Sequence, residues 1–171
     1  GDDTPAGIDA GSAYVFTRSD STWTQWQQLV AGDAVVGDAF GGALAIADDT
    51  LLVGATGKTV GGRTGAGATY VFISSGGNWT QQAELTPGDL LSNQSNTKFG
   101  SSVALSGGTA AIGASGGYNA DQYKTGAVYV FTGSGSTWTL QQKLAGTGST
   151  FFGSAVAVDG DVALVGADPS T

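Results

Sequence analysis

The chain contains the same series of aromatic and glycine landmarks three times, in one order and at nearly constant spacing. Tyr-Val-Phe triplets begin at positions 14, 70 and 129, and each is followed nine positions later by Trp-Thr. Phe-Gly pairs begin at positions 40, 99 and 152, and each is followed 14 positions later by Gly-Ala. Leucines at 29, 85 and 144 close the copies. A period of this length is typical of repeat architectures and constrains the fold more than any single motif.

Each copy contains four short apolar runs separated by turns, and the stretch from Phe99 to Leu144 shows all four. Apolar spacings of three and four residues are not sustained through so many glycines and β-branched residues, so no helix is expected. Four strands per repeat predict an all-β fold, a β-propeller of four-stranded antiparallel blades. The chain holds three blade-equivalents within a single propeller segment, 1–171.

The order of the landmarks divides this segment into two full blades and two halves. The full blades span 40–85 and 99–144. The half-blade at 1–29 contains only the third and fourth strands of a blade, and the half-blade at 152–168 contains only the first and second. Unpaired half-blades leave apolar strands and edge backbone groups exposed. The chain is therefore expected to pair with itself through complementary half-blades, as a dimer or a filament, or with the rest of a longer propeller.

Composition excludes several classes of function. The net charge is −8 and there are only six Lys and Arg residues, which argues against nucleic-acid binding because that requires a basic patch. Cys and His are absent, so thiolate chemistry and the usual histidine general base are absent too. No apolar run is long enough for membrane insertion. The Ser-, Thr- and Gly-rich composition favours an extracellular or cell-surface location.

The quoted landmarks resemble the FG-GAP repeat of integrin-α-like β-propellers, most closely its short bacterial version. The family signature is similar to F-G-x-x-V-A, V-G-A-P, G-A-x-Y-V-F and W-x-x-x-x-x-L. The Phe-Gly pairs are intact in all three copies, whereas Thr56, Ser115 and Asp168 replace the final proline. The resemblance covers most of the chain and implies a propeller scaffold used outside the cell.

In that family, some repeats carry a calcium loop between their first two strands. The equivalent segments here are Ala47–Thr50, Ser106–Thr109 and Val158–Asp161, each too short and with at most two carboxylates. Calcium prefers six to eight oxygen ligands, so no integrin-type calcium site is expected in these segments. No cofactor is expected, with calcium kept as the less favoured alternative. The remaining metal candidates are four carboxylates that would gather if the two chain ends met: Asp2, Asp3, Asp9 and Asp168.

Trp26 is the leading candidate for a binding residue, because its equivalents are the polar Gln82 and Gln141. Its parity along the strand is opposite to that of Trp23, so it is expected to face away from the packing that buries Trp23. Tyr118 and Tyr123 lie in an aromatic loop that could join the same contact surface. An exposed aromatic side chain stacks on a sugar ring or anchors an interface.

No residues stand out as catalytic, so the chain is expected to be non-enzymatic. The leading interpretation is an extracellular propeller module for adhesion, ligand binding or assembly, with a glycan or protein ligand. The first alternative is a structural subunit of a surface layer or filament assembled by strand exchange. The second is a carbohydrate-active enzyme, which would need a pair of carboxylates in a cleft.

Overall fold

The computed structural model describes residues 9–90, 94–117, 125–146 and 150–169, and this part of the chain forms strands and turns without a helix. Its strands are β1 (Ala13–Ser19), β2 (Thr22–Leu29), β3 (Phe40–Ala47), β4 (Thr50–Ala55), β5 (Ala68–Ser75), β6 (Asn78–Leu85), β7 (Phe99–Ser106), β8 (Thr109–Ala114), β9 (Ala127–Ser134), β10 (Thr137–Ala145), β11 (Thr150–Asp159) and β12 (Val162–Pro169).

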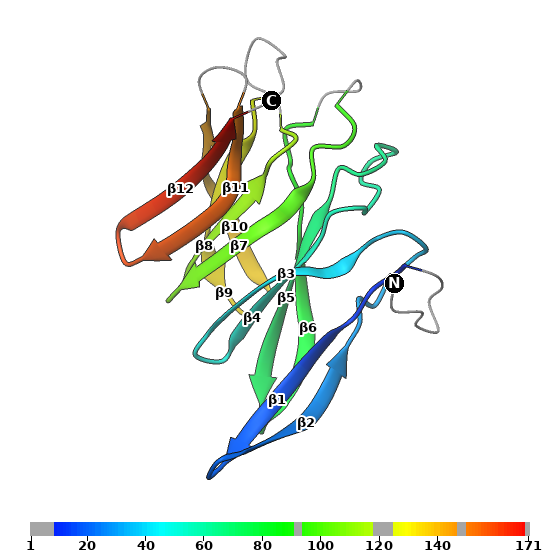
Figure 1. The fold of residues 1–171 in the computed structure, drawn as a ribbon, viewed down its shortest axis with the longest axis vertical. Helices are drawn as coiled ribbons and strands as arrows, with labels where there is room; N and C mark the ends of the chain where they lie inside the picture. Colours follow the sequence, from blue (N-terminus) through cyan, green and yellow to red (C-terminus); the bar gives the residue numbers. More distant parts are fainter. Residues whose placement is uncertain (1–8, 91–93, 118–124, 147–149, 170–171) are drawn as a thin grey trace.

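These strands form four antiparallel sheets that fan out as successive blades (Figure 1). The first full blade has the order β3-β4-β5-β6, and the second has the order β7-β8-β9-β10. The β1–β2 half-blade and the β11–β12 half-blade are separate two-stranded sheets at opposite ends of the row. The predicted fold class, an all-β propeller of four-stranded blades with three blade-equivalents, is confirmed.

Two of the three repeated phenylalanines, Phe40 and Phe99, are core anchors. Phe40 and Phe99 are buried, and each ring meets the Tyr and Phe rings of the third strand of its own blade at centroid distances of 5.2–6.2 Å. The cluster around Phe99 also includes Leu52, Val71 and Leu85 from the preceding blade. One apolar core therefore joins neighbouring blades.

Backbone contacts join each blade to the next at an equivalent point. The amide N–H groups of Phe40, Phe99 and Phe152 donate to the carbonyls of Ala10, Ala66 and Thr125 at 2.9–3.0 Å. The glycine after each of these carbonyls, at positions 11, 67 and 126, has φ between 78° and 84°. A Cβ there would overlap the phenylalanine carbonyl oxygen, so no other residue fits this joint without displacement.

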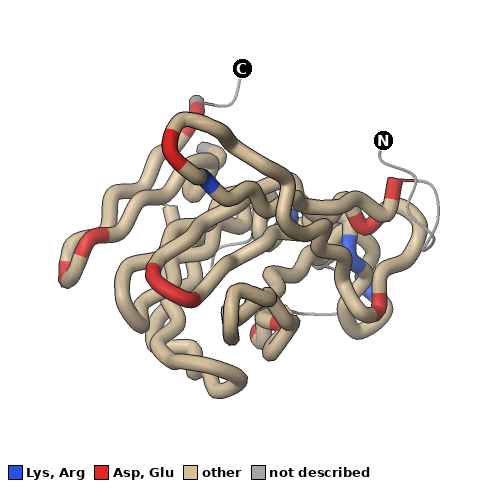
Figure 2. Tube along the Cα trace, turned by 90° about the horizontal axis from the view of Figure 1, so that it is seen from below, with Lys and Arg blue, Asp and Glu red and all other residues tan. Residues whose placement is uncertain are grey.

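Acidic residues sit mainly at turns and loops, whereas Lys and Arg occur at a few scattered positions (Figure 2). Asp48 and Asp49, for example, make the turn between β3 and β4. In the described residues no helix is long and apolar enough to cross a membrane.

Candidate functional site

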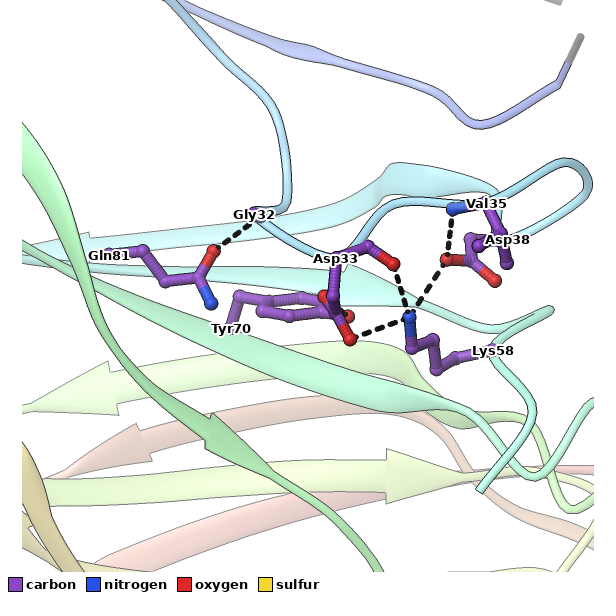
Figure 3. A network of polar contacts seen from close by, with 7 residues as sticks. All are labelled: Gly32, Asp33, Val35, Asp38, Lys58, Tyr70 and Gln81. Atoms are coloured by element: carbon purple, nitrogen blue, oxygen red, sulfur yellow. Dashed lines mark hydrogen bonds and ion pairs between the residues drawn. The ribbon is translucent and has the colours of Figure 1, made fainter. Parts of the chain in front are cut away.

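A nearly buried lysine forms ion pairs with two carboxylates on the loop that leads into the first full blade (Figure 3). Lys58 Nζ lies 2.8 Å from Asp33 Oδ2 and 3.2 Å from Asp38 Oδ2, and it also donates to the Asp33 carbonyl oxygen at 2.9 Å. The Tyr70 hydroxyl donates to Asp33 Oδ1 at 2.8 Å. Asp38 accepts the N–H of Val35 at 3.0 Å. The loop is thus fastened to both β5 and the segment after β4.

The electrostatics of this cluster favour the charged forms of its ion pair. Burial disfavours ionised Asp33, but hydrogen bonds from Lys58 and Tyr70 outweigh it and lower the pKa of that carboxyl. Burial likewise opposes the charge on Lys58, yet hydrogen bonds to Asp33 and Asp38 raise its pKa. Burial and then the bond to Asp33 raise the pKa of Tyr70, so its hydroxyl stays protonated.

The second full blade repeats the Tyr–Asp contact, but its lysine comes from another strand: Lys143 is on β10, whereas Lys58 follows β4. The Tyr129 hydroxyl donates to Asp89 Oδ1 at 2.7 Å, and Lys143 Nζ lies 2.6 Å from Asp89 Oδ2. Burial opposes ionisation of Asp89, but hydrogen bonds from Lys143 and Tyr129 lower its pKa. We call this Tyr–Asp–Lys contact the loop clasp. The tyrosine and the aspartate occupy equivalent positions in both full blades, so the Tyr–Asp bond is the repeated part that fastens the loop between blades; the lysine position differs.

The carboxylates of the clasp are all engaged by lysine, tyrosine or backbone donors. Lys58 forms ion pairs with both Asp33 and Asp38. The raised pKa of Tyr70 keeps its hydroxyl protonated, so it acts as a hydrogen-bond donor. A glycosidase needs one carboxyl that gives up a proton and one that stays ionised beside a cleft. Glu84 has a raised pKa, caused first by burial and then by the charge of Asp33, but the described cavities are lined by other residues.

Trp26 lies exposed on β2, with 54 % of its surface accessible. Its indole Nε1 donates to the Gly77 carbonyl oxygen at 2.7 Å, in the turn between β5 and β6. The hydrogen bond joins β2, the outer strand of the half-blade, to the β5–β6 turn of the first full blade. Trp26 therefore presents an accessible ring while its indole N–H is hydrogen-bonded.

The alternation argument that contrasted Trp26 with Trp23 is wrong. Val15 pairs with Gln27 and Phe16 with Gln25, so Trp26 is the extra residue of a β-bulge, across which side chains do not simply alternate. Gln82 and Gln141 occupy the same bulge position in β6 and β10. Trp23 is not buried either: 64 % of it is accessible, while its equivalents Trp79 and Trp138 pack against the core clusters.

Of the remaining site candidates, only Asp9 and Asp168 lie in the described part of the chain, and they are far apart (Figure 1). Tyr118, Tyr123, Asp2 and Asp3 lie outside the described residues. Asp9 precedes the β1–β2 half-blade, whereas Asp168 is on β12 in the other half-blade, at the far end of the row (Figure 1). Within the described ranges, no three acidic side chains are grouped closely enough to hold a metal ion.

Many exposed apolar side chains lie on the half-blades and the strands beside them. Large accessible side chains line the β1–β2 half-blade, the β3–β4 hairpin and the β11–β12 half-blade: Tyr14, Phe16, Trp23, Trp26, Leu44, Ile46, Phe151, Val162 and Leu164. An apolar groove of about 270 Å³ runs between β1 and the β3–β4 hairpin.

The sequence predicted exposed half-blades, but it did not predict this groove or the loop clasp. An Asp four positions after the closing leucine, at Leu29–Asp33 and Leu85–Asp89, was the available signal for the clasp.

The blades, their backbone joints and their Phe-Gly anchors define a β-propeller segment built from sequence repeats. The chain belongs to the FG-GAP repeat family: the family's profile matches residues 23–72 and 79–131. FG-GAP repeats form propeller modules of the adhesion and ligand-binding type, are generally non-enzymatic, and typically occur in extracellular domains. A comparison with curated proteins finds no match to this chain.

Proposed function

We propose that the chain is a non-enzymatic extracellular propeller module that binds a glycan or protein ligand through Trp26. The observation that carries the proposal is the indole itself, exposed on an outer strand yet fixed by its hydrogen bond to Gly77. A ring held in one orientation loses little conformational entropy when it stacks on a ligand. The carboxylates of the loop clasp are already committed to lysine and tyrosine, which favours binding over hydrolysis.

Glycan-array binding tests the proposal, with the native chain compared to Trp26→Gln. Glutamine already occupies this bulge position in both full blades, so the substitution is expected to change the free energy of unfolding by no more than about 1 kcal/mol. The matched control is Leu140→Gln, which removes an exposed apolar side chain from β10. Loss of binding in Trp26→Gln alone is the expected result. Equal binding by all three chains, or a loss of several kcal/mol in stability, would contradict it.

A second candidate is a structural subunit that assembles by strand exchange, as in a surface layer or filament. The exposed half-blades favour it, because edge strands with apolar faces are templates for further pairing. Negative-stain images that show regular sheets or filaments of the purified chain would support this role.

A further inference from the structure

The outer edges of the β1–β2 half-blade and the first full blade are joined by a series of hydrogen bonds from side chains to the backbone, which begins at Trp26. The Gln27 side chain donates to the Trp79 carbonyl oxygen at 2.8 Å and accepts the Trp79 N–H at 2.9 Å. Further along, Gln81 Oε1 accepts the N–H of Gly32 at 2.9 Å (Figure 3). We call this series the rim strip; it consists of Trp26, Gln27 and Gly32 on one side and Gly77, Trp79 and Gln81 on the other.

The rim strip is particular to this junction between blades. At the junction of the two full blades, Ala83 and Leu140 occupy the positions of Gln27 and Gln81. Within the described residues no side chain of β6 is hydrogen-bonded to β10 there. The repeat therefore joins its blades without the two glutamines, so their presence at the first junction calls for a further explanation.

Gln81 presents unused hydrogen-bond donors at one end of the strip. Its Oε1 is engaged by Gly32, whereas its Nε2 has no partner in the part of the chain that the structure describes. The side chain is exposed, and its amide nitrogen points away from Gly32 (Figure 3). A primary amide carries two N–H donors, so this group is able to bond to the hydroxyl oxygens of a ligand.

Trp26 supplies an apolar surface at the other end. Its ring is 54 % accessible, and its Cζ2 atom would lie 4.0 Å from a Cβ at Gly77, so the indole rests beside a turn that carries no side chain at that point. The flat face of an indole matches the apolar C–H face of a sugar ring. The two ends of the strip thus offer the two kinds of contact that a sugar requires, stacking and hydrogen bonding.

The separation of the two ends indicates the size of the ligand. Four residues lead from Gly77 to Gln81, which is about 13 Å of extended chain. One sugar ring is too small to contact both ends, so a ligand that uses both must be a chain of sugars. None of the six residues of the strip is charged, and the net charge of −8 disfavours acidic glycans.

We propose that the rim strip binds a neutral, extended oligosaccharide of about three sugar units or more, with one ring stacked on Trp26 and a hydroxyl group of another bonded to Gln81 Nε2. A β-1,4-linked chain of glucose or N-acetylglucosamine has the required shape, because its equatorial substituents leave the faces of each ring apolar. The inference rests on the proposed function, since it assigns a ligand to the same indole, and it adds Gln81 as a second binding residue.

Titration calorimetry with two homologous series tests the proposal, from the disaccharide to the hexasaccharide of β-1,4-linked glucose and of β-1,4-linked N-acetylglucosamine. In at least one series the affinity of the native chain is expected to rise about tenfold or more between the disaccharide and the tetrasaccharide, because only the longer ligand contacts both ends. Trp26→Gln is expected to abolish binding at every length.

Gln81→Glu tests the second contact directly. The variant keeps an oxygen that accepts the Gly32 N–H but removes the amide donors, so the affinity for the tetrasaccharide is expected to fall about fivefold to tenfold while that for the disaccharide is unchanged. The matched control is Gln82→Glu, which adds the same charge to the same strand at a residue whose amide already donates to Thr80. Its affinities are expected to stay within about twofold of the native values.

The outcomes separate this proposal from the proposed function. Trp26-dependent binding that does not vary with ligand length, or that Gln81→Glu does not weaken, would overturn the rim strip and leave the role of Trp26 intact. Failure of both series to bind would also overturn the rim strip, and the glycan array then decides whether Trp26 has another ligand. Binding that survives Trp26→Gln would contradict both proposals.

Discussion

At the scale of single residues, the loop clasp is the feature whose energetics can be tested most directly. Tyr70 donates to a carboxylate that also contacts Lys58, in a partly desolvated setting. Tyr70→Phe removes the donor and leaves the ring, so we expect a loss of about 1.5–3 kcal/mol, the range for hydrogen bonds to charged groups. Urea unfolding measures it.

The matched control for this change is Tyr14→Phe. The Tyr14 hydroxyl accepts from the neutral Gln28 amide at the surface, so its removal is expected to cost well under 1 kcal/mol. An equal loss in Tyr70→Phe and Tyr14→Phe would contradict the assignment of the clasp. So would an undiminished effect of Tyr70→Phe in an Asp33→Ala background, because the acceptor is absent there.

Glu84 and Asp33 respond to pH with opposite signs. Burial, followed by the charge of Asp33, raises the pKa of Glu84, so the folded state holds this proton more tightly than the unfolded state. Protonated Glu84 therefore stabilises the fold relative to ionised Glu84. This contribution is fully present below the pKa of Glu84 in the unfolded chain, and it is lost as the pH rises through the higher pKa of the folded chain. Glu84→Gln is therefore expected to raise the melting temperature at pH 7 and to have little effect near pH 3. A lower melting temperature at pH 7 would refute this assignment.

Asp33 and Asp89 contribute in the other direction. Burial opposes their ionisation, but their lysine and tyrosine partners lower both pKa values below the ordinary 3.8. Their stabilisation is present above the unfolded pKa and is lost as pH falls through the folded one. The melting temperature of the native chain should therefore fall as the pH is lowered below about 4. The fall should be smaller in the Asp33→Asn, Asp89→Asn double variant.

At the scale of strands and turns, the glycine of each blade joint is the most constrained position. Gly67 has φ of 84°, and a Cβ there would overlap the Phe99 carbonyl oxygen. Gly62 has a similar φ of 79° with open space around it. Gly62→Ala is thus expected to cost only the 1–2 kcal/mol or so of left-handed backbone strain, and Gly67→Ala clearly more. Denaturant unfolding compares them, and equal losses would show that the joint can shift.

The strands themselves could be predicted from the sequence because their landmarks are local. Tyr-Val-Phe, Trp-Thr and Phe-Gly each mark a strand within a few residues, and their threefold recurrence supplies the blade order. The bulge at Trp26 could not be predicted, since an extra residue in one strand is visible only against its partner. The contact of Lys58 with Asp33 depends on the paths of two separate loops, one before β3 and one after β4, which no periodicity encodes.

At the scale of the whole molecule, the turns between the first and second strands of each blade determine the dependence on calcium. These strands are joined by tight two-residue turns, Asp48-Asp49, Gly107-Gly108 and Gly160-Asp161. Such turns offer too few oxygen ligands for a cation that takes six to eight. A chelator is therefore expected to leave the melting temperature unchanged. A fall of more than about 10 °C, which corresponds to a loss of several kcal/mol in the free energy of unfolding, would contradict this prediction.

The joint between blades has an evolutionary consequence. Each joint consists of a main-chain amide, the carbonyl that it donates to, and the glycine after that carbonyl. The amides belong to residues 40, 99 and 152, the carbonyls to 10, 66 and 125, and the glycines to 11, 67 and 126. Because these atoms are common to every unit, a gene can gain or lose one whole unit by duplication or unequal recombination, and the new neighbours still fit. Side chains elsewhere in a blade are then free to diverge, as at Trp26, while the number of blades changes in whole steps.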